Sequence, residues 1–158
     1  MKRMLGRSAA GPPAVTAGVD IASVSRIEGI VRRWGDRFLK RVYTAGEVAY
    51  CLSRACPARS LAARFAAKEA FFKAVSGWHQ GGLGHRSIEV VTGAGGAPAI
   101  LPHGRARTAL GDRQACLSLS HEQDLAVAVV VTSGPTGRRP RRKAGSRAGS
   151  RRGRRRLA

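Results

Sequence analysis

The longest helical pattern in the chain spans residues 59–76. The segment contains no Pro or Gly and consists mainly of Ala, Leu, Phe and Lys, which favour helix. At about 100° per residue its large apolar side chains share one arc, and alanine occupies most of the remaining circumference. The arc consists of Leu61, Phe65, Phe72 and Val75. The pattern therefore predicts one long, largely buried helix.

Charged residues interrupt this apolar pattern. Lys68 falls in the middle of the arc, and Glu69 lies at its edge beside Lys73. Charges in such positions lose hydration, and the free-energy cost of this loss must be offset by a fixed partner. One interpretation is an i,i+4 salt bridge from Glu69 to Lys73, which contributes only a few tenths of a kcal/mol. The other is that these charges belong to a functional site.

A second acid lies in an apolar strand. Residues 15–21 are rich in Val and Ile and contain one glycine, Gly18, which permits close backbone approach, and one acid, Asp20. Asp20 could cap the helix that follows, but Ser23 and Ser25 could do the same. An acid from a strand and Glu69 from a buried helix, with lysines nearby, would suit Mg²⁺, which typically takes one or two protein carboxylates.

The remaining pattern predicts an α+β domain. A helix is expected near residues 24–34, and a short helical stretch begins near Thr44. There Thr44 and Glu47 have the spacing of a capping box, a structural role that we prefer to a catalytic one. Short strands are expected at 88–91 and 99–101 and a short helix at 105–110. Residues 115–120 and 125–132 predict a hairpin, whose apolar second arm is expected to be a central strand.

Charge divides the 158-residue chain into three parts. The formal net charge is +20, and residues 134–158 contain 11 Arg and Lys and no acid, whereas all nine acids lie within 17–133. We predict a flexible N-terminal extension at 1–16, one domain at 17–133 and a disordered Arg-rich tail at 134–158 that binds polyanions non-specifically. A nucleic-acid-binding protein is the alternative interpretation, but it leaves acids in apolar elements unexplained.

The three cysteines and the absence of long apolar runs indicate the compartment. Cys51, Cys56 and Cys116 show no metal-like spacing, so reduced thiols are expected. No run is long enough to span a membrane, and Gly and Pro interrupt the N-terminus where a signal peptide would need an apolar stretch. A cytoplasmic protein without a membrane partner is expected.

Four blocks in order resemble the holo-acyl-carrier-protein synthases, the small phosphopantetheinyl transferases. They comprise residues 18–27, 38–47 and 64–74, and the closing segment of 117–121 with 126–130. Each block is weakly diagnostic alone, but the four occur with compatible spacing over roughly residues 17–132. The resemblance implies a compact antiparallel sheet packed on one long helix, and a homotrimer with active sites between subunits.

The resemblance also implies a reaction. The 4′-phosphopantetheine arm of coenzyme A would move to a serine of apo acyl carrier protein, which is acidic around that serine, with Mg²⁺ as cofactor. Polyketide or peptide synthase carriers are alternative clients. The proton acceptor would be Glu69 or a metal-bound water. The implied residues are Asp20 and Glu69 for the metal, Lys73 with them for catalysis, Arg64, Lys73, His121 and Pro98 for coenzyme A, and Arg26 for carrier docking.

Some positions depart from the family pattern. The block before the middle strand usually carries an aromatic residue and an Asp, where this chain has His85 and Ser87. The turn near the adenine lacks its lysine, because Ala97 stands between Gly96 and Pro98. Both changes concern coenzyme affinity and not the metal site. Three loop histidines match nothing in the family and are expected on the surface: His79, His85 and His103.

Overall fold

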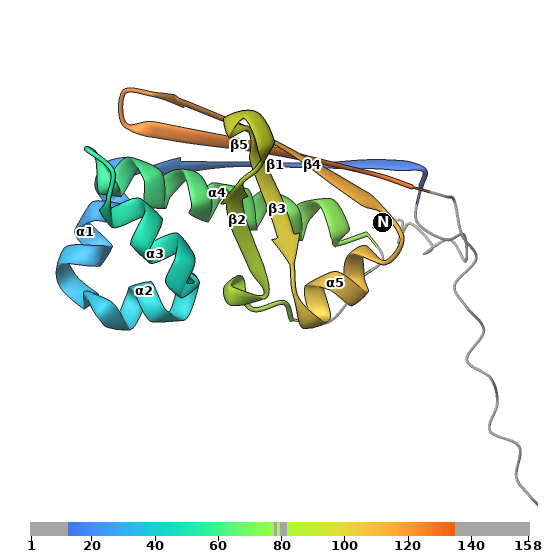
Figure 1. Cartoon of the computed structure of the whole chain (residues 1–158), viewed down its shortest axis with the longest axis horizontal. Coiled ribbons are helices and arrows are strands. Elements are labelled where there is room, and N and C mark those ends of the chain that lie inside the picture. Colours follow the sequence, from blue (N-terminus) through green and yellow to red (C-terminus); the bar gives the residue numbers. More distant parts are fainter. Residues whose placement is uncertain (1–12, 78, 80–81, 135–158) are drawn as a thin grey trace, which may run out of the picture.

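The computed structural model describes residues 13–77, 79 and 82–134 (Figure 1). Most of the predicted N-terminal extension, residues 1–12, and of the predicted Arg-rich tail, residues 135–158, lies outside the described residues. The elements in chain order are β1 (Val15–Ser23), α1 (Val24–Trp34), α2 (Asp36–Val42), α3 (Ala45–Leu52), α4 (Pro57–Val75), the 3₁₀ turn η1 (His85–Ser87), β2 (Ile88–Thr92), the turn η2 (Ala94–Gly96), β3 (Pro98–Pro102), α5 (Gly104–Leu110), β4 (Gln114–Glu122) and β5 (Leu125–Ser133).

An antiparallel sheet packs on one long helix, as predicted, and a second, two-stranded antiparallel sheet lies beside them. The larger sheet has the order β1-β5-β4, so the apolar β5 is the central strand. In Figure 1 this sheet runs along the top, with α4 and the other helices beneath it. The smaller sheet pairs β2 with β3. Within the described residues, no helix combines the length and apolar character needed to cross a bilayer.

The β1 strand and α4 touch through their main chains. A Cβ atom added at Gly18 would collide with the carbonyl oxygen of Ala70 and lie 2.6 Å from the Ala74 nitrogen. The alanine side of α4 makes this approach possible, because Ala66, Ala67 and Ala70 are fully buried there. The predicted close approach at Gly18 is confirmed, and it fixes the distance between β1 and α4.

The α2 helix was not predicted. Only seven residues long, it starts where Gly35 adopts a φ of +48° and breaks α1. It buries Leu39 and Val42 and exposes the ion pair of Asp36 and Lys40, with 3.0 Å between Oδ2 and Nζ. Helices this short depend on packing and not on propensity, so the local sequence carries little signal for them.

The β4–β5 turn is tied to the start of α1. Ser23 caps α1, its hydroxyl accepting from the Arg26 amide. Asp124, in the turn, accepts hydrogen bonds of 2.8 Å from the hydroxyls of Ser25 and Ser23 and from the Ser25 amide. These bonds, led by those from Ser25, hold the pKa of the Asp124 carboxyl below its usual value. The first turn of α1 is therefore positioned by the sheet.

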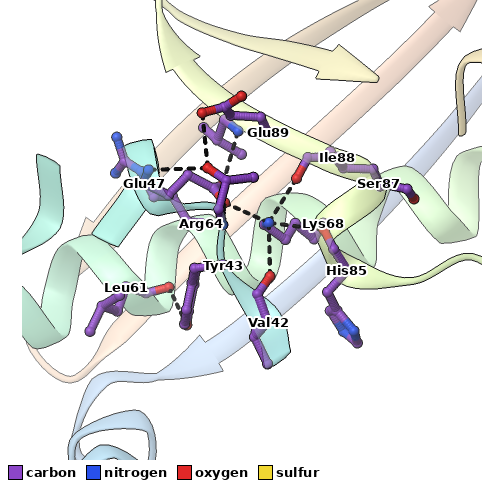
Figure 2. Close-up of polar contacts among 12 residues, drawn as sticks. Val42, Tyr43, Glu47, Leu61, Arg64, Lys68, His85, Ser87, Ile88 and Glu89 are labelled. Atoms are coloured by element: carbon purple, nitrogen blue, oxygen red, sulfur yellow. Dashed lines mark hydrogen bonds and ion pairs between the residues drawn. The ribbon is translucent and has the colours of Figure 1, made fainter. Parts of the chain in front are cut away.

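A buried ammonium joins α4 to four other segments, namely α2, α3, η1 and β2 (Figure 2). Lys68 is fully buried, and its Nζ lies 2.7 Å from Glu47 Oε2. The same Nζ donates to the carbonyl oxygens of Val42, His85 and Ile88 at 2.7–2.9 Å. Burial lowers the pKa of the Lys68 ammonium, and the Glu47 carboxylate opposes that shift. The charge that interrupted the apolar arc is thus compensated by fixed oxygen atoms.

Glu47 has the structural role that the sequence predicted. Its Oε2 accepts from the Thr44 amide while the Thr44 hydroxyl accepts from the Glu47 amide, which completes the capping box. Its Oε1 accepts from the Val90 amide at 2.9 Å. The carboxylate therefore connects α3, α4 and β2, a wider role than the capping box alone.

We predict that Lys68→Met destabilises the fold severely. The change leaves Glu47 buried without a cation and removes the donor from three carbonyl groups, so the free energy of unfolding should fall by about 3–5 kcal/mol. Urea denaturation followed by circular dichroism measures the loss. Lys40→Met, which breaks an exposed pair on α2, is the control and should cost less than about 1 kcal/mol. If Lys68→Met lost as little unfolding free energy as Lys40→Met, the Lys68 network would contribute little to stability.

Candidate active site

Asp20 and Lys73 meet across the contact between β1 and α4. Asp20 Oδ1 lies 2.8 Å from Lys73 Nζ, and the same ammonium donates to the Val19 carbonyl at 2.8 Å. The Asp20 side chain is 16% exposed, whereas that of Lys73 is 54% exposed. The interpretation that Glu69 and Lys73 form an i,i+4 salt bridge is therefore wrong. The Lys73 side chain turns toward β1, where Asp20 provides the opposite charge.

Glu69 pairs with a histidine that the sequence analysis left on the surface. Its Oε1 lies 2.6 Å from Nε2 of His85, and both side chains are 31% exposed. The surface expectation for His85 is wrong because its ring packs against Phe65 and Phe72 on α4. Glu69 and Lys73 are one turn apart, so their Cβ atoms lie about 5–6 Å from each other. The carboxylates of Asp20 and Glu69 therefore flank the same turn of α4.

The two carboxylates suit a hard divalent cation. Each uses one oxygen, Asp20 Oδ1 toward Lys73 and Glu69 Oε1 toward His85. The second oxygen of each has no hydrogen-bond partner in the part of the chain that the structure describes. That part also holds no cluster of three or more acidic, His or Cys residues. Two open carboxylate oxygens match Mg²⁺, which completes its shell with water and substrate phosphate.

A basic cavity of about 600 Å³ lies beside Arg64. The Arg64 guanidinium packs 4.1 Å from the centre of the Tyr50 ring, and its buried Nε has no hydrogen-bond partner among the described residues. A side-chain hydrogen bond between Thr92 and Tyr50 lowers the pKa of the Tyr50 phenol, and the positive charges of Arg54 and Arg64 lower it further. The cavity is also lined by Glu89 and Gly96. A cavity with two guanidinium groups and an aromatic ring is suited to a phosphorylated nucleotide.

Of the other two predicted coenzyme contacts, Pro98 lies near the Arg64 cavity, whereas His121 lies away from the candidate site within one chain. Pro98 begins β3 and pairs with Thr92, which lines the cavity. Gly96 also lines the cavity, but Pro98 itself does not. His121 is exposed near the end of β4, opposite Ala126, which in turn pairs with Ala22 of β1. Two strand spacings, about 10 Å, therefore separate His121 from β1. The structure brings together Asp20, Lys73 and Glu69 but not His121.

Arg26 lies in the first turn of α1, three residues after the end of β1. It is exposed, and no ion pair reaches it from the described residues. Arg32 at the other end of the helix pairs with Glu28 at 3.7 Å. Arg26 is thus the less neutralised of these two cations, and it stands at the end of the strand that carries Asp20.

The sequence analysis missed His85, Tyr50, Arg54 and Glu89. Tyr50 and Arg54 are four residues apart, which could have suggested one helical face beside Arg64. Glu89 could have been noted as a lone acid in a strand, as Asp20 was. His85 lies in a glycine-rich segment without periodicity, and only its place in a block that normally holds an aromatic residue pointed to packing.

Comparisons with known proteins identify the family of the chain. Residues 16–130 match the family model described as the 4′-phosphopantetheinyl transferase superfamily. The chain is 45% identical over 117 residues to the holo-acyl-carrier-protein synthase of Koribacter versatilis, covering 72% of this chain and 94% of that protein. It is 46% identical over 122 residues to the synthase of Gloeobacter violaceus, covering 74% and 91%.

Solved structures show the same architecture. The synthase of Neisseria meningitidis is 34% identical, with a TM-score of 0.66 over 75% of this chain and 98% of that one. The Helicobacter pylori synthase, solved in complex with coenzyme A, is 32% identical, with a TM-score of 0.65 over 74% and 99%. The fold and these matches together place the chain in the 4′-phosphopantetheinyl transferase superfamily, among the holo-acyl-carrier-protein synthases.

Proposed function

We propose that the chain transfers 4′-phosphopantetheine from coenzyme A to a serine of apo acyl carrier protein. The serine oxygen forms the new bond to phosphorus while its proton passes to Glu69 or to a water at the cation site. The bond from that phosphorus to the bridging oxygen breaks, and adenosine 3′,5′-bisphosphate leaves. The observation that carries the proposal is the meeting of Asp20 and Lys73 beside Glu69 on one turn of α4. The free thiols of Cys51, Cys56 and Cys116 agree with a reaction in the cytoplasm.

Phosphoryl transfer needs neutralised charge and correct positioning more than covalent chemistry. Asp20 and Glu69 would hold Mg²⁺, which supplies charge neutralisation at the pyrophosphate when bound. The Lys73 ammonium, fixed by Asp20 and the Val19 carbonyl and 54% exposed, is placed to meet a phosphate oxygen from the solvent side. This arrangement supports the roles that the family resemblance implied for the three residues.

The Arg64 cavity is the site that we propose for the adenosine end of coenzyme A. Arg64 lies five residues before Glu69, about 7.5 Å along the helix axis and about 140° around it, so a ligand with separated phosphates must curve around α4 to reach both positions. The buried Arg64 Nε offers an N–H group that a phosphate oxygen could accept. Arg54 and Tyr50 add a second cation and an aromatic ring to the cavity, in a chain where Ala97 stands in place of the family lysine.

We predict that Asp20→Asn and Glu69→Gln each reduce transfer by at least about a hundredfold, because both would remove charge from the cation site. The assay combines coenzyme A, Mg²⁺ and apo acyl carrier protein, and intact mass reports phosphopantetheine addition. EDTA should stop the wild-type reaction, and excess Mg²⁺ should restore it. Asp112→Asn changes an exposed turn acid and should retain activity.

Two outcomes would contradict this assignment. If the wild-type chain added no phosphopantetheine to any carrier tested, the proposed reaction would be wrong. If both variants lost helical circular dichroism along with activity, Asp20 and Glu69 would be structural residues.

The outer face of the large sheet supports a homotrimer. By the strand register this face carries Val19 and Ile21 of β1 and Leu125 and Val131 of β5, which are 49%, 57%, 47% and 36% exposed. No described helix covers it, since the helices lie on the other side (Figure 1). Among the described residues, Glu122 is the single charged residue at the outward positions of β1, β4 and β5. We propose that copies of this chain cover the face and that His121 of one copy completes the site of its neighbour.

We predict that Val129→Lys, which places a charge at the centre of the outer face, gives a folded, inactive monomer. Sedimentation equilibrium measures the mass, and Leu101→Lys, the same type of change at an exposed β3 position, should keep the trimer.

Mixing Asp20→Asn and His121→Ala subunits should restore up to about a quarter of wild-type activity after random exchange, because each active site would need one residue from each variant. No recovery after proven exchange would place both residues in one subunit's site.

We also propose that the carrier protein docks at Arg26. The partner is acidic around its serine, and an exposed guanidinium at the end of β1 offers complementary charge close to Asp20. Charges at an interface rim act mainly on association rate and salt dependence.

We predict that Arg26→Glu raises the Michaelis constant for the carrier protein about tenfold or more and changes that for coenzyme A little. Steady-state kinetics at two salt concentrations measure both constants, and high salt should narrow the difference from wild type. Arg105→Glu makes the same charge change on α5 and should leave carrier binding unchanged. An equal effect of the two variants would show that only net charge matters.

A further inference from the structure

His85 is held against α4 by ring packing and by a hydrogen bond to its backbone carbonyl. The ring stacks on Phe65, with centroids 5.6 Å apart and planes 17° apart, and meets the edge of Phe72 at 5.2 Å. Its carbonyl oxygen accepts from the buried Lys68 ammonium at 2.9 Å. In Figure 2 the His85 ring points away from the Lys68 centre. The position of the imidazole is therefore fixed before any ligand binds.

Two consecutive residues of α4 hold the two ends of this histidine. Lys68 binds its carbonyl oxygen, and Glu69 binds its ring through a 2.6 Å contact between Oε1 and Nε2. An ionised carboxylate only accepts, so the imidazole N–H donates. Among the described residues Glu69 has no other hydrogen-bond partner. The orientation of this flexible, 31% exposed side chain therefore depends on one bond to a rigid ring.

That bond leaves Glu69 Oε2 as the open oxygen. A glutamate side chain loses rotamer entropy when it is fixed, and this cost is met before the cation binds if a second residue already holds the side chain. Carboxylate ligands of metals generally rely on such outer hydrogen bonds, whose loss lowers metal affinity. A phenylalanine at position 85 would keep the ring packing but could not make the bond.

We propose that His85 is a positioning residue that orients the Glu69 carboxylate and thereby sets the affinity of the site for a divalent cation. The proposal rests on the proposed function, because it takes Glu69 as a cation ligand. His85 contacts neither the substrate nor the cation in this role, and it acts only through Glu69.

The test compares His85→Phe with His85→Gln. The phenylalanine keeps an aromatic ring between Phe65 and Phe72, whereas the glutamine keeps an N–H donor for Glu69. Free Mn²⁺, which shares the oxygen preference of Mg²⁺, is titrated in the presence of coenzyme A and followed by electron paramagnetic resonance. We expect Mn²⁺ affinity to fall about 10- to 100-fold in His85→Phe and to recover most of that loss in His85→Gln.

A matched control comes from the other histidine–acid pair. His103 Nε2 lies 3.3 Å from Glu89 Oε2, so His103→Phe removes a similar bond away from Glu69. Its Mn²⁺ affinity should equal that of the wild type. If His85→Phe folds poorly by circular dichroism, His85→Met, with a flexible apolar side chain, takes its place with the same expectation.

The outcomes separate this inference from the proposed function. Wild-type Mn²⁺ affinity in a folded His85→Phe or His85→Met variant would overturn the positioning role, as would an equal loss in His85→Phe and His85→Gln. In either case Glu69→Gln would still abolish Mn²⁺ binding and transfer. If the wild-type chain bound no Mn²⁺ and transferred nothing, the proposed function itself would fail, and the inference with it.

Discussion

The buried pair of Lys68 and Glu47 connects segments that apolar packing alone would leave free to slide. Lys68 binds Glu47 at the start of α3 and carbonyl groups at the end of α2, in η1 and in β2. Because a buried charge tolerates few arrangements of its partners, this network specifies how α4 meets the small sheet. The next residue, Glu69, carries the carboxylate of the proposed cation site. One turn of α4 thus carries both the structural anchor and the acid that we propose as a cation ligand.

The fold was predictable where a pattern was long or strongly alternating. The helix expected at 59–76 appears as α4 at Pro57–Val75, and the expected hairpin appears as β4 and β5. The strand expected at 15–21 continues to Ser23 because its pairing with β5 continues to Leu125. The seven-residue α2 was not predicted, since its helical geometry depends on Leu39 and Val42 packing into a core that no local pattern reveals.

The site was predictable as far as single residues out of place in apolar elements could show it. Asp20 and Glu69 stood out for that reason, and Lys68 stood out as a charge that needed partners. Which charges pair could not be read from spacing, because Lys73 is equally reachable from Glu69 along the helix and from Asp20 across space. His85 could not be identified either, since its role depends on a loop returning to α4 after ten residues without periodicity.

The main-chain contact at Gly18 has a consequence for how the protein can vary. Even one methyl group there must push β1 away from the Ala70 carbonyl and the Ala74 nitrogen. Asp20, two residues along the same strand, would move with it and away from Lys73. The spacing of Asp20 and Lys73 is therefore encoded in a residue that has no side chain. In a saturation library selected for activity, position 18 should tolerate as few amino acids as the acids themselves.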